Sequence, residues 1–369
     1  MKKNTLSLLV VGNGTIGISH DNKFYISNHT ADFLIDLRNR GFVPSYMAMA
    51  SLYDNNSDLL NFELNKEGLR SVYLTKGNFI GSIYRLAFNL FKTDYVYIFY
   101  PGSLAKIIAF LCLLVGKPYG VYVRGERYLD GKVSSVILKR TRFILTVSPN
   151  IENSLSYLNN NVKTIRPMLN INKSDFSLQP PIIIPPKCWK ILFVGNLNVD
   201  KGVPELLDAI LKLHKEGFSY ELRFVGGGTL YNDLKVSLRD GPLSKNVTLT
   251  GLITDKNILM SEYKNADIFI LPTHHEGFPR VLYEAMTQGL PIITTMVGGI
   301  PGRMRDNINC LAIDVRNCDS IVLAVKKLTN DLDLYNKIGS SGYMTAWNVF
   351  EELNSHGELV CEMIEENYA

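Results

Sequence analysis

Residues 276–294 read EGFPRVLYEAMTQGLPIIT, and the order of residue types in this string indicates a loop, a helix and a strand. One apolar run ends just before it at Leu271, and a second, Pro291–Thr295, closes it. Pro279 stands where the first helical turn needs no backbone donor, so we expect a helix to begin around Phe278 or Pro279. A strand–helix–strand unit of this kind implies parallel strands with helices packed on the sheet.

The same alternation runs through the whole chain. In the second half, the predicted strands are Lys190–Val194, Glu221–Val225, Val247–Thr250, Asp267–Leu271 and Pro291–Thr295. In the first half, they are Leu6–Val11, Val43–Ala50, Ser71–Leu74, Tyr95–Phe99, Gly120–Val123 and Phe143–Val147. Helix-like runs separate them, and such alternation is typical of α/β domains whose parallel sheet is covered on both faces.

Proline interrupts this rhythm between Asp175 and Lys187, where four prolines favour extended chain and remove backbone donors. Because 369 residues are more than one hydrophobic core usually serves, we interpret this segment as a linker between two domains. The predicted parts are a Rossmann-like domain at 1–174, a linker at 175–188, a second Rossmann-like domain at 189–345 and a helical segment at 346–369. One possibility is that this last segment packs back on the N-terminal domain.

The composition is that of an ordinary globular protein, with 46% hydrophobic and 20% charged residues, which argues against a fibrous or largely disordered chain. The five cysteines are scattered without a Cys-x-x-Cys pair, so we expect free thiols and no zinc ribbon. The longest apolar helix candidate is Leu104–Val115, about a dozen residues, which is too short to cross roughly 30 Å of hydrocarbon. We therefore expect a cytoplasmic protein.

The net charge of +4 is too small to indicate nucleic acid as a partner, but the charge is unevenly distributed. Residues 1–170 hold 20 Lys and Arg against 11 Asp and Glu, whereas residues 171–369 hold 19 against 24. One interpretation is that the first half faces an anionic membrane surface or a phosphate-bearing acceptor. The other is a solvated surface without a partner.

The loop and helix at 276–284 carry the candidate chemistry. A helix N-terminus offers unpaired N–H groups and a partial positive charge, which suit a phosphate. Glu276 and Glu284 are eight residues apart, on the order of 12 Å along a helix axis. That distance would place one carboxylate at a hexose and the other at the ribose of a nucleotide sugar. A helix cap and a solvated glutamate are the structural alternative.

The string at 276–294, followed by Gly298 and Gly299, resembles the sugar-nucleotide motif of retaining GT-B glycosyltransferases, specifically glycosyltransferase family 4. The segments that resemble further elements of the same nucleotide-binding domain are Phe193–Gly202, Phe224–Gly228 and Val247–Gly251. Together they cover residues 189–345, and the first half of the chain matches more loosely. The resemblance implies a GT-B fold, in which two Rossmann-like domains face each other across a cleft.

By this resemblance, Lys201 holds the donor diphosphate, Glu284 binds the ribose and Glu276 holds the transferred sugar. The backbone amides that share this last role are those near Gly277, Phe278 and Pro279. A lysine suits the diphosphate because a point charge on a flexible stem follows negative charge onto the leaving group.

Four further residues are assigned with alternatives left open. Gly14, in a glycine-rich run that follows the first predicted strand, approaches the diphosphate from the first domain or forms a plain turn. Gly226 and Gly227 let backbone approach the nucleotide or only make a turn. Asn196 stands where the family commonly has arginine, so one of two usual positive charges on the diphosphate is missing. Either Arg280, Arg303 or Arg124 compensates for it, or the donor affinity is lower.

Arg124 ends a predicted first-domain strand where many family members have a histidine next to the reacting sugar. It would hold a sugar hydroxyl or an acceptor phosphate, and the alternative is a salt bridge to Glu126 or Asp130. We expect no metal at the site, because the neighbouring His274 and His275 point in different directions in an extended loop.

The expected activity is therefore that of a retaining, metal-independent glycosyltransferase that moves a hexose-type sugar from a nucleoside diphosphate sugar to an acceptor hydroxyl. The donor is a substrate, and no cofactor is expected. We expect a lipid-linked or saccharide acceptor in bacterial surface polysaccharide assembly, at the inner face of the cell membrane. The alternatives are a sugar-nucleotide epimerase or phosphorylase of GT-B architecture, and an inactive relative that binds nucleotide sugars.

Overall fold

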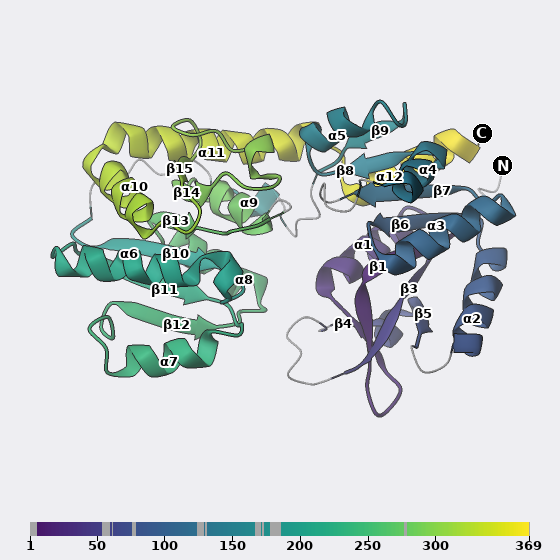
Figure 1. The fold of residues 1–369 in the computed structure, drawn as a ribbon, viewed down its shortest axis with the longest axis horizontal. Helices are drawn as coiled ribbons and strands as arrows, with labels where there is room; N and C mark the ends of the chain where they lie inside the picture. The colour runs from purple at the N-terminus through teal and green to yellow at the C-terminus, as the bar shows by residue number, and fades with distance from the viewer. Residues whose placement is uncertain are drawn as a thin grey trace. The chain divides into compact units, whose positions relative to one another are not determined.

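The chain forms two compact units in a computed structural model, which describes residues 6–53, 60, 62–75, 79–123, 129, 131–166, 171, 173–177, 186–276 and 279–368. The first unit comprises Met1–Asn170 and Leu353–Ala369, and the second comprises Ile171–Glu352 (Figure 1). None of the helices within these described ranges is both long and apolar enough to cross a bilayer.

The first unit is built on a mainly parallel sheet. Its strands are β1 (Ser7–Ile18), β2 (Phe24–Ile26), β3 (Val43–Leu52), β4 (Phe62–Glu63), β5 (Arg70–Leu74), β6 (Tyr95–Tyr100), β7 (Tyr119–Val123), β8 (Ile144–Thr146) and β9 (Val162–Thr164). Parallel pairing gives the order β5-β3-β1-β6-β7-β8-β9, and the short strands β2 and β4 add antiparallel to the far end of β1. The strand order therefore reverses between β1 and β6, which is the switch point of a doubly wound sheet.

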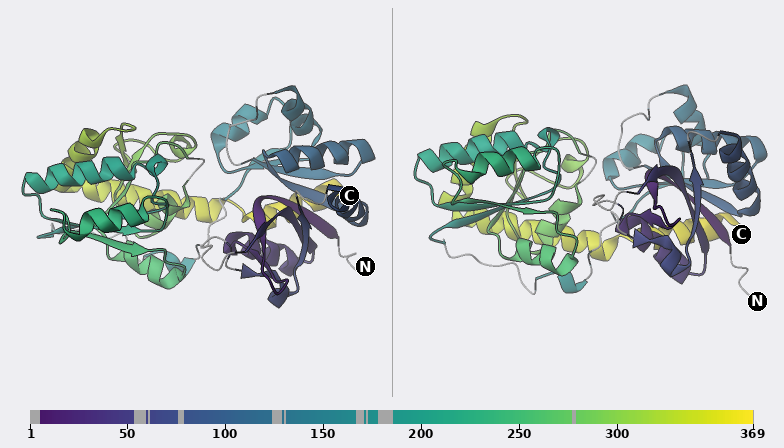
Figure 2. Two further views of the ribbon diagram at one scale, coloured as in Figure 1. Left: turned by 60° about the horizontal axis from the view of Figure 1, so that its bottom comes forward. Right: turned by 90° about the horizontal axis from the view of Figure 1, so that it is seen from below.

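Helices cover both faces of this sheet (Figures 1 and 2). They are α1 (Asn28–Asn39), α2 (Phe79–Lys92), α3 (Ser103–Val115), α4 (Lys132–Arg140), α5 (Pro149–Leu155) and α12 (His356–Tyr368), with a 3₁₀ turn at Leu64–Glu67. One core cluster holds apolar residues of α1 and α12, and the other holds those of α2, α3, α4 and α5. Ser27 and Ser148 cap α1 and α5 by accepting backbone N–H bonds.

The last helix, α12, belongs to the first unit although it follows the second in sequence. It packs beside α1, and Val360, Met363 and Ile364 are buried in the core shared with that helix. The His356 ring stacks on Phe33 at 4.4 Å between centroids, and its Nε2 lies 2.6 Å from the hydroxyl oxygen of the buried Tyr97. The helical segment predicted at 346–369 is thus divided, because residues up to Glu352 belong to the second unit.

In the second unit, the described residues form a six-stranded sheet in which every pairing is parallel. Its strands are β10 (Trp189–Val194), β11 (Tyr220–Val225), β12 (Val247–Gly251), β13 (Ile268–Leu271), β14 (Ile292–Thr295) and β15 (Leu311–Ile313). The order is β12-β11-β10-β13-β14-β15, so the chain winds outward from β10 to β12 and then returns to the other side at β13. The switch point lies between β10 and β13.

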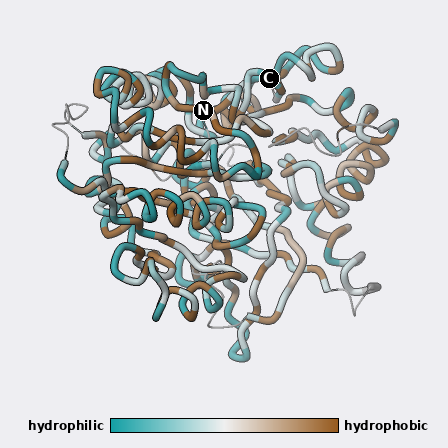
Figure 3. The backbone as a smooth tube through the Cα atoms, turned by 60° about the vertical axis from the view of Figure 1, so that its left-hand side comes forward, coloured by the Kyte–Doolittle hydropathy of each residue, from teal (hydrophilic) through white to brown (hydrophobic). Residues whose placement is uncertain are grey.

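Amphipathic helices cover this second sheet, and hydrophobic and hydrophilic stretches alternate along the chain (Figure 3). The helices are α6 (Val203–Lys215), α7 (Tyr231–Arg239), α8 (Lys256–Lys264), α9 (Arg280–Thr287), α10 (Cys318–Asn330) and α11 (Leu332–Glu352). Short 3₁₀ turns are present at Lys173–Asp175, Val199–Lys201 and Ile300–Gly302. Asp255 and Asn317 cap α8 and α10, each through its side-chain oxygen.

Two predicted boundaries are corrected by the structure. The run Gly12–Gly17 was expected to follow the first strand as a loop, but β1 continues through it to Ile18. The pairing with β3 breaks after Val11 and resumes at Thr15. The residues of β1 between these two positions form a bulge, after which the strand rejoins its ladder with β3.

The predicted linker also begins later than residue 175. Asp175 forms an ion pair with Lys256 at 2.6 Å, Phe176 is buried, and the Ser177 N–H donates to the Thr287 carbonyl at 3.0 Å. These residues therefore pack within the second unit rather than running as extended chain. The proline-rich part at 178–185 lies outside the described residues.

Candidate functional site

The candidate site of the second unit lies where β10 and β13 end, because ligands of doubly wound sheets bind outside the carboxyl ends of strands at the switch point. We call the residues Gly195–Lys201, which follow β10, and Pro272–Glu276, which follow β13, the switch edge. These two loops join neighbouring strands to different helices. Their side chains and backbone groups thus meet although they are far apart in sequence.

An ion pair between Lys201 and Glu276 joins the two loops of the switch edge. Each side chain is only 18% exposed, so the two charges are largely withdrawn from water. Lys201 is placed by the short 3₁₀ turn before α6, and Glu276 lies in the loop after β13. The residues predicted to hold the diphosphate and the sugar are therefore in contact with each other.

Backbone and side-chain hydrogen bonds fix the two loops beneath this pair. The His274 N–H donates to the Asp200 carbonyl at 2.8 Å, and His274 Nε2 lies 3.0 Å from Glu205 Oε1. Thr273 accepts at its carbonyl from the Thr295 hydroxyl at 2.6 Å. His274 is thus a positioning residue that ties the loop after β13 to α6, and the adjacent-histidine pattern in the sequence does not indicate this role.

Glu284 lies on α9 and is half-buried. The hydroxyl of Tyr263, a fully buried residue of α8, donates to Glu284 Oε2 at 2.7 Å. Burial raises the pKa of the Glu284 carboxyl above its ordinary value, although the hydrogen bond from Tyr263 acts in the opposite direction. Tyr263 is a residue of this site that the sequence analysis missed, and no motif marks it.

The helix α9 begins two residues later than Phe278 and one later than Pro279, the predicted starting points. Pro279 is its N-cap with extended backbone angles, and the first helical residue is Arg280. Glu276 is therefore in the loop, and the stretch from Glu276 to Glu284 is not a continuous helix. The expected axial separation of about 12 Å, which assumed such a helix, does not apply.

The glycine-rich turn after β11 packs on the turn after β10. A side-chain carbon on Gly226, whose φ is +142°, would lie 2.0 Å from the Gly195 carbonyl oxygen. The Gly227 carbonyl accepts from the Leu197 N–H at 2.8 Å. Both glycines thus hold the backbone of the switch edge, beside the exposed Asn196. This packing accounts for Gly226, and a contact with nucleotide stays a prediction for all three residues.

Gly298 fixes the backbone of Glu276. Its φ is +57°, and a side-chain carbon at this position would lie 1.7 Å from the Glu276 carbonyl oxygen. The next N–H, that of Gly299, donates to the same carbonyl at 3.4 Å. The backbone conformation at Gly298 and its close approach to Glu276 therefore explain why glycine follows the 276–294 string.

Replacing Gly298 with alanine is expected to destabilise the protein by roughly 3 kcal/mol or more, because the methyl group meets fixed backbone in addition to the strained φ. Gly217, with φ +76° and no described atom within 4 Å of an added carbon, is the matched control. Gly217→Ala should cost only about 1–2 kcal/mol. Urea unfolding of both variants measures the difference, and equal losses would contradict the steric explanation.

The predicted residues of the first unit are only partly described. Gly14 is exposed just beyond the point where β1 leaves its ladder with β3, at the carboxyl side of the switch between β1 and β6. The neighbouring Asn13 donates through Nδ2 to the Pro101 carbonyl at 2.8 Å, which ties this run to the segment after β6. Arg124 lies outside the described residues, as do Gly277 and Phe278 of the second unit.

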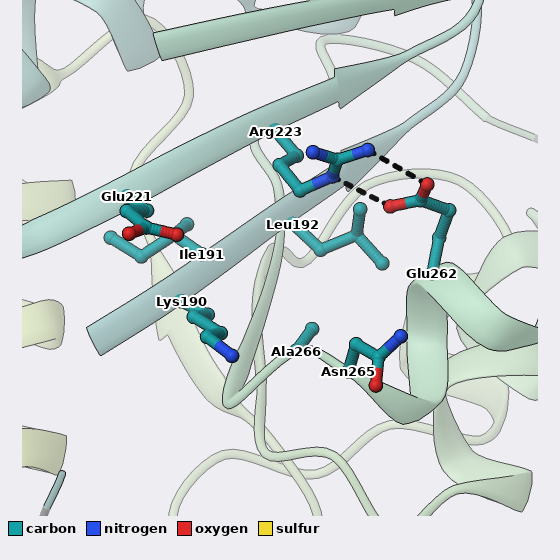
Figure 4. A pocket seen from close by; sticks show the side chains of 8 residues that line it. All are labelled: Lys190, Ile191, Leu192, Glu221, Arg223, Glu262, Asn265 and Ala266. Carbon is teal, nitrogen blue, oxygen red and sulfur yellow. Dashed lines mark hydrogen bonds and ion pairs between the residues drawn. The ribbon is translucent and has the colours of Figure 1, made fainter. Parts of the chain in front are cut away.

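A pocket of about 320 Å³ in the second unit lies away from the switch edge (Figure 4). It is lined by Lys190 and Glu221 near the amino ends of β10 and β11, and by residues at the end of α8. Arg223 donates to both carboxylate oxygens of Glu262 there, at 2.7 and 2.8 Å. Because its lining comes from the opposite end of the strands, this pocket is not the predicted donor site.

Two Rossmann-like units in one chain have the architecture of GT-B glycosyltransferases. Residues 177–345 match the family model of the glycosyl transferases group 1. The predicted fold class and the predicted resemblance to GT-B glycosyltransferases are thus confirmed.

The chain is similar to two proteins of Staphylococcus aureus, one of which is a capsular polysaccharide biosynthesis glycosyltransferase. Protein CapJ of Staphylococcus aureus is 27% identical over 276 residues, which cover 70% of each chain. The capsular polysaccharide biosynthesis glycosyltransferase CapM of the same species is 28% identical over 180 residues, covering 48% of this chain and 44% of CapM. Among solved structures, Anabaena HepE in complex with UDP aligns over 98% of this chain and all of its own, with a TM-score of 0.68 and 14% identity.

Proposed function

We propose that this chain is a retaining glycosyltransferase that moves a hexose-type sugar from a nucleoside diphosphate sugar to an acceptor hydroxyl. The observation that carries the proposal is the Lys201–Glu276 pair at the switch edge, where a doubly wound sheet binds its ligand. The HepE structure that shares the fold holds UDP, which is consistent with a nucleotide ligand. The proposal includes independence of a divalent metal.

Each residue has a chemical task in the proposed reaction. Lys201 stabilises the negative charge that develops on the departing diphosphate, and backbone N–H groups near Pro279 assist. Glu276 accepts hydrogen bonds from the transferred sugar, and Glu284 accepts them from the ribose hydroxyls. The acceptor hydroxyl attacks from the face that the diphosphate leaves, which retains the anomeric configuration, and the leaving diphosphate takes the acceptor's proton.

Five other residues have proposed roles around the donor and the acceptor. The turn residues Gly226 and Gly227, together with Asn196, bring backbone and one amide side chain to the nucleotide. Gly14 and Arg124 of the first unit would act on the diphosphate and on the acceptor side. These assignments follow the family resemblance and are secondary to the ion pair.

The proposed acceptor is a lipid-linked or saccharide hydroxyl in the assembly of a bacterial surface polysaccharide. Two facts support this choice: the name of one relative, the capsular polysaccharide biosynthesis glycosyltransferase CapM, and the excess of basic residues in the first 170 positions. A basic unit suits an anionic lipid carrier or membrane at the inner face of the cell membrane.

The test is a panel of UDP, GDP, ADP and their common sugars, first by thermal shift and then by transfer with the product anomer assigned by NMR. A ligand at about 100 times its Kd should stabilise the protein by roughly 2.7 kcal/mol. We expect one nucleotide class to stabilise the chain, and its sugar to be transferred with retention and without loss of rate in EDTA. Inversion, epimerised donor, phosphorolysis or binding without turnover would each reject the proposal in favour of a different reaction or an inactive relative.

A further inference from the structure

Helices α2, α3 and α4 carry apolar side chains on the side that faces away from the sheet. Their inward residues, among them Leu86, Ile108 and Ile137, share one core cluster, so the three helices cover the same face of the first unit. The outward residues that we call the outer helix face are Phe88, Phe91, Phe110, Leu114, Val133 and Val136, and all are exposed. Each helix is therefore apolar on two sides.

The spacing of these residues places the two on each helix side by side. On each helix the two members are three or four positions apart, which places them next to each other on the helix surface. Helix α3 packs beside α4, and both α2 and α3 contact β1 (Figure 1). Single exposed apolar residues are ordinary, but residues gathered on neighbouring helices form a patch that marks an interaction surface.

The charges on these helices all have one sign. Across the 14, 13 and 9 residues of α2, α3 and α4, the sequence has no aspartate or glutamate. The basic residues on the same helices are Arg85, Lys92, Lys106, Lys132, Lys139 and Arg140. The Lys92 ammonium lies 4.2 Å from the centre of the Phe88 ring, so a cation and an aromatic ring of this surface are adjacent.

We propose that the outer helix face binds an anionic lipid bilayer. Aromatic and aliphatic side chains enter the headgroup region of a bilayer, while flexible basic side chains reach lipid phosphates from the same surface. A second copy of this chain fits less well, because a symmetric contact would oppose two sets of positive charges. This membrane surface rests on the proposed function, because a lipid-linked acceptor would be located at the bilayer.

Vesicle co-sedimentation of the full chain tests this surface, with phosphatidylglycerol vesicles compared with phosphatidylcholine vesicles. We expect binding to phosphatidylglycerol that falls as salt rises. The charge variant Lys132→Gln/Lys139→Gln/Arg140→Gln should lower the partition coefficient on the order of 100-fold, roughly fivefold for each charge. The apolar variant Phe91→Ser/Leu114→Ser should lower it by about tenfold or more.

Matched controls come from the second unit. Val236 and Leu323 are 75% and 67% exposed, close to the 74% of Phe91 and 66% of Leu114, and both should tolerate serine without loss of binding. The charge control is Lys215→Gln/Lys235→Gln/Arg239→Gln, which removes three exposed charges elsewhere. Because all these side chains are exposed, the melting temperatures should stay unchanged, which separates lost binding from lost folding.

Three outcomes would overturn the proposal. They are an absence of phosphatidylglycerol binding by the wild type, equal losses in the control variants, and a stable dimer in sedimentation velocity that Phe91→Ser/Leu114→Ser dissociates. Transfer to a soluble acceptor reports the proposed function separately. If the wild type transfers sugar but does not bind phosphatidylglycerol vesicles, only the membrane surface is rejected. If the wild type binds the vesicles but does not transfer sugar, only the proposed reaction is rejected.

Discussion

Lys201→Ala is expected to lower kcat by about 10²–10³ with a smaller change in donor affinity, because the lysine acts most strongly on charge that develops in the transition state. Both members of the Lys201–Glu276 pair are largely withdrawn from water, which strengthens the electrostatic effect of the ammonium on a leaving diphosphate. The variant also leaves Glu276 without its cation, so we expect a lower melting temperature. Steady-state transfer kinetics and thermal unfolding measure the two effects.

The effect of removing the Glu276 charge distinguishes a substrate-binding Lys201 from a structural one. In the unliganded protein, a diphosphate must compete with the Glu276 carboxylate for the Lys201 ammonium. Glu276→Gln removes that competition, so a free nucleoside diphosphate should bind as tightly as in the wild type or tighter, while transfer slows. If Lys201 only held the loops together, Glu276→Gln would leave transfer unchanged or weaken both binding and stability.

The control for Lys201 is Lys212, an ion-paired lysine on α6 whose ammonium lies 2.6 Å from Asp319. Lys212→Ala removes a lysine and breaks an ion pair in the same unit, away from the switch edge. We expect kcat within about twofold of the wild type, since an exposed surface ion pair contributes little to stability. A loss at Lys201 no greater than that at Lys212 would contradict the proposed role.

The double-variant cycle of Lys201→Ala and Glu276→Gln measures the coupling between the two residues. Groups that contact each other and act in one step give effects that do not add. We expect the double variant to be little slower than Lys201→Ala alone. Fully additive losses in kcat would show that the two side chains act independently.

The sequence predicted the parallel α/β fold because the strands of such sheets are buried on both faces and read as short apolar runs. The runs Val43–Ala50 and Glu221–Val225 lie within β3 and β11, and the predicted fold class is confirmed. The predicted end of β1 was wrong because a glycine-rich stretch has the composition of a turn. The pairing with other strands shows that β1 continues: it rejoins β3 at Thr15 and pairs with β2 at Gly17 and Ile18.

The sequence predicted the individual residues of the candidate site, but it did not predict the contacts between them. Lys201 and Glu276 are 75 residues apart, so their pairing depends on the strand order, which no local pattern gives. The same holds for Tyr263, which comes from the helix before β13 and reaches Glu284 through the packing of α8 on α9. Helical spacing from Glu276 to Glu284 failed because Pro279 caps the helix instead of lying inside it.

Glu284→Ala is expected to weaken nucleotide binding by roughly 10- to 100-fold, because hydrogen bonds to a charged acceptor contribute about 1.5–3 kcal/mol. The loss should depend on the ribose, so a 2′,3′-dideoxy nucleotide should bind the wild type and the variant equally. Isothermal titration with both nucleotides measures the difference. The matched control is Glu221→Ala, an exposed glutamate on β11, which should leave both affinities unchanged.

The same glutamate should reduce the stability of the unliganded protein at neutral pH. Burial raises the pKa of Glu284, so the folded state binds its proton more readily than the unfolded state does. Its contribution to stability is then most favourable below the ordinary carboxyl pKa and is lost as pH rises through the raised value. Glu284→Gln should therefore increase the melting temperature relative to wild type at pH 7 and much less at pH 4.

Opposite effects of one substitution on stability and binding would separate a ligand-binding carboxylate from a structural one. The Tyr263 hydroxyl can still donate to the amide oxygen of glutamine, so the hydrogen bond within the unit is kept while the charge is removed. A structural glutamate would lose stability in Glu284→Gln at both pH values and show no preference for a ribose with hydroxyls. A destabilised variant with wild-type nucleotide affinity would therefore reject Glu284 as the ribose-binding residue.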